Sequence, residues 1–304
     1  MLKLNIEGVK PTLEKTNFPK VVIFETSTYC NLKCIMCPQS KIRRIGQYMD
    51  FEVFKKAANE IAIEDINVEL WFAIMGEPLV NPDLLLEMII YAKSLGLNNL
   101  NLNTNACLLT TDISKRLIES GIARVTIGID ATDAETYEKI RCKGNFVQTV
   151  ASINELLEIN AKFNNPVEII LQFIVMDENE HQQELFKDYW LERGATIKIR
   201  PKLGWGTAVE SNQLYLNEKD RDFPCPWIVR TMSIHVDGSV AQCDADWDDL
   251  YNTGNIKNRT IKDIWNTELN EIRQKHWNLD FNLLPCSECK DWQAGRSYFF
   301  YPNS

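Results

Sequence analysis

Strand-like and helical patterns alternate through the first two thirds of the chain, and this alternation limits its fold more than any other feature. The strand-like runs are short and apolar, and they lie at 21–25, 68–74, 99–103, 123–130, 168–176 and 195–200. Helical periodicity fills segments between them, at 50–62, 81–96, 110–121 and 146–160. Such alternation is typical of right-handed βαβ units around a parallel sheet. Six units predict an α/β fold with a partial (β/α)6 barrel, since the closed barrel has eight.

Residues with helix-capping properties lie at the expected ends of several helices. Asn81, Thr111 and Asp133 occupy places where an N-cap side chain accepts a hydrogen bond from the first turn. Gly96 and Gly121 follow predicted helices, where glycine takes the left-handed conformation that ends a helix. These five residues predict where the helices begin and end.

The alternation stops after residue 204. A β-hairpin is predicted at 231–243, with its turn at Asp237–Gly238, and one amphipathic helix is predicted at 261–277. The chain therefore divides into an N-terminal extension at 1–20, a barrel at 21–204 and a small C-terminal unit at 205–304.

Charge and hydropathy limit the partners of the chain. The formal net charge is −9 over 304 residues, which disfavours nucleic acids and anionic membranes as partners. No apolar run is long enough to span a bilayer, and the first residues lack the apolar core of a signal peptide. We therefore expect a cytoplasmic protein.

The chain has nine cysteines, and in a reducing compartment they are more typical of metal sites or catalysis than of disulfides. Cys30, Cys34 and Cys37 form a C-x3-C-x2-C motif directly after the first predicted strand. Three thiolates on one loop can hold three irons of a cubane 4Fe–4S cluster and leave the fourth iron open to a substrate. The alternative is a zinc site, which normally needs a fourth ligand.

Further residues extend the motif to a family pattern. Gly76–Glu77–Pro78 ends the second predicted strand, Thr104–Asn105 ends the third, and Asp130 ends the fourth. With the three cysteines, they resemble the radical S-adenosylmethionine (SAM) superfamily. In that family the reduced cluster cleaves SAM, and the resulting 5′-deoxyadenosyl radical removes a hydrogen atom from the substrate.

The resemblance implies a set of contacts to SAM. Gly76, Glu77 and Pro78 would hold the methionine amino group, and Asn105 and Asp130 would lie close to SAM. Met36 stands where the family usually has an aromatic residue whose backbone contacts adenine. Gly128 stands where the family usually has a serine that binds the ribose, so Asp130 is expected to replace that contact.

Four more cysteines, Cys225, Cys243, Cys286 and Cys289, lie in the C-terminal unit. Four thiolates would saturate a second cubane, although their spacing fits a zinc ribbon equally well. The segment resembles the SPASM/twitch extension of radical SAM enzymes. Since no cysteine follows Cys289, the shorter twitch form is the better match, and it implies one auxiliary 4Fe–4S cluster.

The twitch pattern resembles enzymes of the 2-deoxy-scyllo-inosamine dehydrogenase type. This implies oxidation or epimerisation at a carbon of a polar, carbohydrate- or cyclitol-like molecule. Cys107 and Cys142 remain as candidate hydrogen donors for epimerisation. Arg200 and Asp244 are candidate catalytic residues for oxidation, and Gln172 is expected in the cofactor-binding pocket between the clusters.

Two other functions stay open. The first is maturation of a ribosomal peptide, although only 29 residues precede Cys30, fewer than a peptide-binding domain needs. The second is a non-catalytic iron–sulfur or zinc protein. For a radical SAM enzyme, the family implies a flavodoxin or ferredoxin as electron donor.

Overall fold

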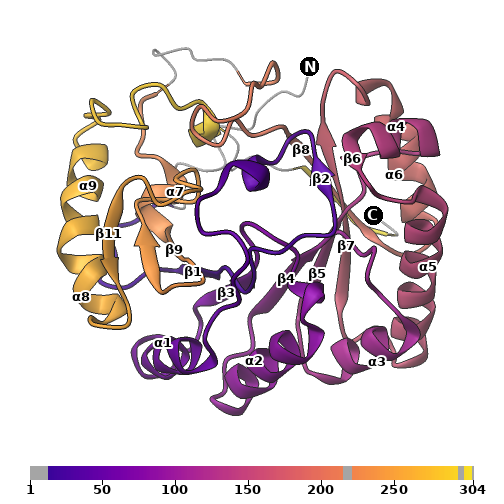
Figure 1. Cartoon of the computed structure of the whole chain (residues 1–304), viewed down its shortest axis with the longest axis horizontal. Coiled ribbons are helices and arrows are strands. Elements are labelled where there is room, and N and C mark those ends of the chain that lie inside the picture. Colours follow the sequence, from indigo (N-terminus) through magenta and orange to yellow (C-terminus); the bar gives the residue numbers. More distant parts are fainter. Residues whose placement is uncertain (1–12, 215–220, 294–297, 303–304) are drawn as a thin grey trace.

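A curved parallel sheet forms the centre of the computed structural model, which describes residues 13–214, 221–293 and 298–302 (Figure 1). Six strands lie side by side in parallel: β1 (Val21–Phe24), β3 (Glu69–Phe72), β4 (Leu100–Thr104), β5 (Arg124–Gly128), β7 (Glu168–Val175) and β8 (Thr196–Pro201). Each falls within one or two residues of its predicted run. The predicted partial (β/α)6 barrel is therefore confirmed.

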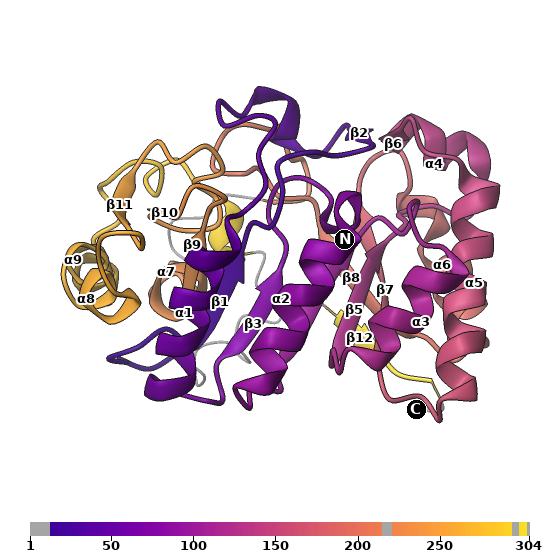
Figure 2. The same cartoon turned by 60° about the horizontal axis from the view of Figure 1, so that its bottom comes forward.

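Helices cover the outer face of this sheet (Figure 2). They are α1 (Phe51–Glu64), α2 (Pro82–Ser94), α3 (Thr111–Glu119), α5 (Phe146–Lys162) and α6 (Gln183–Leu191), with the short α4 (Ala134–Ile140) nearby. Their apolar faces form the main core against the strands, through side chains such as Leu70, Ile89 and Leu171. The opposite face of the strands is free to line the barrel.

The predicted helix N-caps are confirmed at two of three positions. The side chains of Asn81 and Asp133 accept hydrogen bonds from the first turns of α2 and α4. For α3 the prediction was wrong by one residue, because Thr110, and not Thr111, accepts the capping bond. Thr111 is already helical, so its hydroxyl is free to donate to a neighbouring glutamate instead.

The C-terminal unit extends the barrel sheet. Strand β9 (Thr231–Ile234) pairs in parallel with β1, and β10 (Ser239–Ala241) and β11 (Asn252–Asn255) follow in antiparallel fashion. The predicted hairpin is confirmed, with Gly238 at a φ of +81° in its turn. At the other edge, β12 (Tyr298–Phe300) pairs antiparallel with β8. One sheet thus runs from the C-terminal unit through the barrel.

The single helix predicted at 261–277 was wrong. Two helices occupy this segment, α8 (Ile261–Asn266) and α9 (Glu268–Trp277), and Thr267 between them has φ −114° and ψ −99°. The Arg259 guanidinium donates hydrogen bonds to Asp263, Thr267 and Glu268, and these bonds stabilise the break between the two helices. A further short helix, α7 (Pro226–Arg230), packs against α9.

Within the described residues, no helix combines the length and the apolar character needed to cross a bilayer.

Candidate active site

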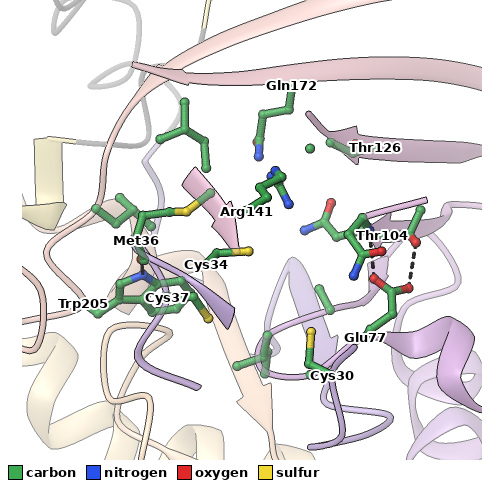
Figure 3. A pocket seen from close by; sticks show the side chains of 18 of the residues that line it. Cys30, Cys34, Met36, Cys37, Glu77, Thr104, Thr126, Arg141, Gln172 and Trp205 are labelled. Atoms are coloured by element: carbon green, nitrogen blue, oxygen red, sulfur yellow. Dashed lines mark hydrogen bonds between the residues drawn. The ribbon is translucent and has the colours of Figure 1, made fainter. Parts of the chain in front are cut away.

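The loop that follows β1 carries the first three cysteines. Its short strand β2 (Lys33–Cys34) pairs antiparallel with β6 (Arg141–Cys142), which anchors the loop over the mouth of the barrel. Cys30, Cys34 and Cys37 all line one pocket, at the carboxyl ends of the barrel strands. Figure 3 shows their three sulfur atoms on the same side of that pocket.

The three thiols fit a cluster with one open iron. Burial is the main cause that raises the pKa of Cys30 to about 11 and that of Cys37 to about 12. Thiolates in so dry a place need a positively charged partner, which iron supplies. In the described part of the chain, no three His, Cys, Asp or Glu side chains are grouped to hold a single metal ion. A cubane instead takes its thiolates at separate corners, which matches three cysteines at separate positions of one loop beside the pocket.

Gly76 and Glu77 lie beside the cluster loop, where β3 gives way to the next turn. Gly76 has a φ of +74°, and a Cβ on it would lie 2.1 Å from the carbonyl oxygen of Ser27. Only glycine allows the two segments to approach so closely. The backbone N–H of Glu77 then donates to the carbonyl of Tyr29 at 2.7 Å, which ties the motif to the loop.

The Glu77 carboxylate is buried and held from three sides. It accepts hydrogen bonds from the Thr104 hydroxyl at 2.6 Å and from the Asn105 backbone N–H at 2.8 Å (Figure 3), and a third from the Leu79 N–H at 3.0 Å. Burial raises its pKa, and these bonds offset part of that rise. Pro78 begins the short 3-10 helix that carries Leu79. A fixed carboxylate at a pocket wall is suited to binding an ammonium group.

Asp130 does not reach the pocket, although the sequence predicted it as a ribose contact. Its carboxylate is fully buried and accepts bonds from the Arg141 side chain at 2.6 and 3.0 Å. The backbone N–H of Ile174 donates to its other oxygen at 2.7 Å. Arg141, in contrast, lines the pocket. Asp130 therefore affects the pocket only by orienting the Arg141 side chain.

Arg141 explains the glycine at position 128. A Cβ on Gly128 would lie 2.2 Å from Arg141 Nη2, so a serine there would collide with the guanidinium. Burial alone would lower the pKa of Arg141, but the charge of Asp130 raises it above its usual value. The sequence analysis missed Arg141, because Asp130 follows β5 and Arg141 lies in β6 beyond α4, and only the fold brings them together. The unusual Gly128 was the one available signal.

Replacing Asp130 with asparagine should destabilise the protein by about 3–5 kcal/mol, because the buried Arg141 would lose its counter-charge. Urea unfolding under anaerobic conditions would measure this loss. The matched control is E168Q, which removes the ion-pair partner of Arg124. Both side chains of that pair are more than a third exposed to solvent. That change should cost at most about 1 kcal/mol. Equal losses in the two variants would contradict the importance of the buried pair.

The rest of the pocket wall comes from the barrel strands and from the turn after β8. It encloses about 160 Å³ and includes Arg200, together with Met36, Thr126, Gln172 and Trp205, which Figure 3 labels. Arg200 Nε donates to Gln172 Oε1 at 3.0 Å, and burial lowers the pKa of Arg200 to about 10. No carboxylate of the described residues lies within ion-pair distance of Arg200. Predicted residues from three parts of the chain thus meet in one pocket.

The two remaining cysteines are not among the residues that line this pocket. Cys107 Sγ lies 3.3 Å from the hydroxyl of Tyr137 and 3.3 Å from that of Thr149, on the side of α5. Cys142 Sγ lies 3.4 Å from the carbonyl oxygen of Lys139. Neither thiol therefore lines the pocket that the cluster cysteines share, although the strand that carries Cys142 pairs with the strand of Cys34.

Asp244 is also absent from the pocket lining. Its carboxylate accepts a hydrogen bond from the Ser233 hydroxyl. Burial raises the pKa of Asp244 to about 6, which that bond only partly offsets. This carboxylate stands in the C-terminal unit, next to Cys243 in the chain.

The last four cysteines meet in a second, smaller cavity. Cys225 precedes α7, Cys243 follows β10, and Cys286 and Cys289 lie beyond α9, yet all four are buried around one space. Burial raises the pKa of all four, to about 12 for Cys225 and about 11 for Cys286. Four thiols around one enclosed space fit a cluster whose irons are all ligated by the protein.

Comparisons with known proteins agree with both sites. The family model described as "Radical SAM superfamily" matches residues 24–188, and that of the SPASM "Iron-sulfur cluster-binding domain" matches 225–290. An AdoMet-dependent heme synthase from Methanosarcina barkeri is 32% identical over 151 residues, which are 49% of this chain and 42% of that protein. The chain spans about half the length of the curated relatives that it matches.

Two solved structures share the fold. BtrN in complex with AdoMet and 2-DOIA is 17% identical with a TM-score of 0.63, over 91% of this chain and 94% of that one. Streptococcus suis SuiB bound to the precursor peptide SuiA is 13% identical with a TM-score of 0.71, over 95% and 73%. With SAM (AdoMet), a SAM-binding 4Fe–4S cluster and an auxiliary cluster as its cofactors, the chain belongs to the radical SAM superfamily and carries a C-terminal SPASM domain.

Proposed function

We propose that this radical SAM enzyme oxidises a hydroxyl-bearing carbon of a polar small molecule of the carbohydrate or cyclitol type. The first cluster and SAM, when bound, supply a 5′-deoxyadenosyl radical that removes one hydrogen atom from the substrate. Completion of a ketone then requires the loss of one electron and of the hydroxyl proton. The chain must therefore offer an electron acceptor near the pocket and a polar wall around the substrate.

The second cavity carries this proposal. Cys225, Cys243, Cys286 and Cys289 all line it, so a cluster that they ligate would have no iron left for a substrate and would be suited to accept an electron. We assign it one cluster of the twitch type. The positions of Cys107 and Cys142 outside the pocket lining support oxidation over epimerisation, which needs a hydrogen donor on the opposite face of the substrate.

We assign the SAM contacts to the side of the pocket nearest the cluster loop. The Glu77 carboxylate suits the methionine amino group, and the Arg141 guanidinium suits its carboxylate. Gly76, Pro78 and Asn105 hold Glu77 in place. The backbone of Met36, whose carbonyl accepts a bond from Trp205, would contact adenine. Asp130 supports these contacts by orienting Arg141.

We assign the substrate to the wall formed by Arg200 and Gln172. Their mutual hydrogen bond and the bond from Arg200 Nη1 to the Pro201 carbonyl fix the guanidinium, which lines the pocket and keeps further N–H groups for a ligand. These donors suit the hydroxyl groups of a sugar or cyclitol. A positive charge beside the reacting carbon also favours the loss of the hydroxyl proton.

Replacing Arg200 with glutamine should reduce substrate-dependent 5′-deoxyadenosine formation by about 10- to 100-fold, since hydrogen bonds from a charged donor contribute about 1.5–3 kcal/mol. The affinity for SAM should stay unchanged. The matched control is R124Q, which removes an arginine at the opposite end of the barrel strands. A similar loss of turnover in both variants would contradict a role of Arg200 at the substrate.

The proposal is tested with substrates that carry deuterium on the carbinol carbon. Reconstituted protein is incubated with SAM, dithionite and a panel of hexoses, aminosugars and aminocyclitols. Oxidation predicts deuterium in 5′-deoxyadenosine and a product that has lost two hydrogens. A product in which hydrogen from solvent has replaced the deuterium, and which is otherwise of unchanged composition, would instead establish epimerisation.

Peptide maturation is the second candidate, because SuiB bound to its precursor peptide overlays 95% of this chain at a TM-score of 0.71. The same assay includes a library of short peptides with deuterated side chains. Deuterium transfer from peptides alone would overturn the carbohydrate proposal and favour this one.

A further inference from the structure

A tryptophan connects the C-terminal unit to the first cluster loop. Trp205 lies in the turn after β8, and its indole Nε1–H donates to the carbonyl oxygen of Met36 at 3.0 Å (Figure 3). Met36 directly precedes Cys37, a ligand of the first cluster, and both residues line the pocket with Trp205. The single hydrogen-bond donor of this side chain is therefore used on the cluster loop.

The turn that carries Trp205 is held by Asp291. The two carboxylate oxygens accept hydrogen bonds from the backbone N–H groups of Gly204 at 2.6 Å and Gly206 at 2.8 Å, on either side of the tryptophan. The N–H of Asp291 in turn donates to Cys289 Sγ at 3.3 Å. A continuous series of contacts thus runs from a ligand of the second cluster to a neighbour of the first.

Trp205 is also held in an unfavourable backbone conformation. Its φ is +50°, in the left-handed region that bulky residues rarely adopt and that costs about 1–2 kcal/mol. Such a conformation persists only where the surrounding contacts enforce it. Here the bonds that Asp291 accepts from Gly204 and Gly206 hold the turn in this conformation, and the indole of Trp205 points to the cluster loop.

We propose that Trp205 is a positioning residue for the first cluster loop and for the SAM bound there. Asp291, which contacts Cys289 of the second cluster, holds the turn that carries Trp205 and so links the two cluster sites. The loop carries three ligands. It is also held by backbone bonds, such as that from Ile35 N–H to the Ile140 carbonyl, and by side-chain bonds, such as that from Arg43 Nε to Asp248. Trp205 adds a contact from the C-terminal unit, about 170 residues further along the chain. The C-terminal unit thereby sets the geometry of SAM binding.

The test compares two Trp→Phe variants that each lose one indole hydrogen bond to a backbone carbonyl. W205F breaks the bond to Met36, and W265F breaks the bond from Trp265, in α8, to Thr16 at 3.1 Å. W205F should bind SAM about fivefold more weakly, the effect of a typical net hydrogen bond. It should also change the electron paramagnetic resonance signal that SAM induces in the reduced first cluster. W265F should match the wild type in both measurements.

A second variant and a second readout guard against simple misfolding. D291N keeps the size of the side chain but cannot accept both backbone bonds, so it should weaken SAM binding in the same direction. Hydrogen exchange of metal-free protein should be faster for residues 30–41 in W205F and D291N than in W265F. Wild-type SAM affinity and wild-type exchange in W205F would overturn the proposal. None of these readouts depends on the substrate, so they do not depend on the proposed oxidation.

Discussion

Replacing Cys30, Cys34 and Cys37 together with alanine is expected to abolish 5′-deoxyadenosine formation and to leave about half of the iron. The three cysteines line one pocket, and the remaining four cluster cysteines line another, so each cluster can form without the ligands of the other. Without its three thiolates the first cluster has no ligand in the pocket, and SAM has no iron to bind. Iron and sulfide analysis and chromatography of the nucleoside products would measure both effects.

The matched control removes thiols that lie outside both cavities. The double variant C107A/C142A should keep its full iron content, because neither sulfur lines the first or the second cavity. Iron lost equally from this control would point to general instability. SAM cleavage that survives in the triple variant would contradict the placement of the first cluster.

The barrel was predictable because the signals that define it are local. Each strand is a short apolar run, and each helix has its own periodicity and its own capping residues, such as Asn81 and Asp133. The order of six parallel strands then follows from the right-handed connection rule. The cysteine loop and the Gly76–Glu77 motif were predictable for the same reason, since each is a short motif at the end of one strand.

The contacts that complete the site are not local, and the sequence did not reveal them. Arg141 reaches the pocket only because Asp130 orients it and Gly128 leaves room for it. Likewise, Asp291 holds the turn of Trp205 from about 86 residues away. No spacing rule connects such residues, because their meeting depends on how loops pack above the sheet.

The break between α8 and α9 illustrates a different limit. The apolar pattern continues through Thr267, so periodicity predicted one helix at 261–277. The break depends on Arg259, whose guanidinium binds three side chains around Thr267 and stabilises a conformation that propensity alone does not favour. The pairing of β9 with β1 was missed for a similar reason, since strands about 210 residues apart meet only in the folded sheet.

Replacing Glu77 with glutamine is expected to weaken SAM binding by about a hundredfold. The variant loses the negative charge that suits the SAM ammonium group, at a buried position where charge matters most. The new amide nitrogen also faces an N–H donor in either orientation, because Leu79 N–H donates to one oxygen of the carboxylate and Asn105 N–H to the other. Equilibrium binding of SAM to anaerobically reconstituted protein would measure the loss.

The control for this prediction is E69Q. Glu69 begins the same strand whose end precedes Glu77, and it accepts a bond from the Trp71 indole at 2.8 Å, away from the pocket. E69Q changes the net charge of the protein by the same amount as E77Q, so a general electrostatic effect would appear in both variants. If E77Q bound SAM as E69Q does, the ammonium contact would belong to another residue. A loss confined to E77Q would assign it to the carboxylate that Thr104 and Asn105 hold at the pocket wall.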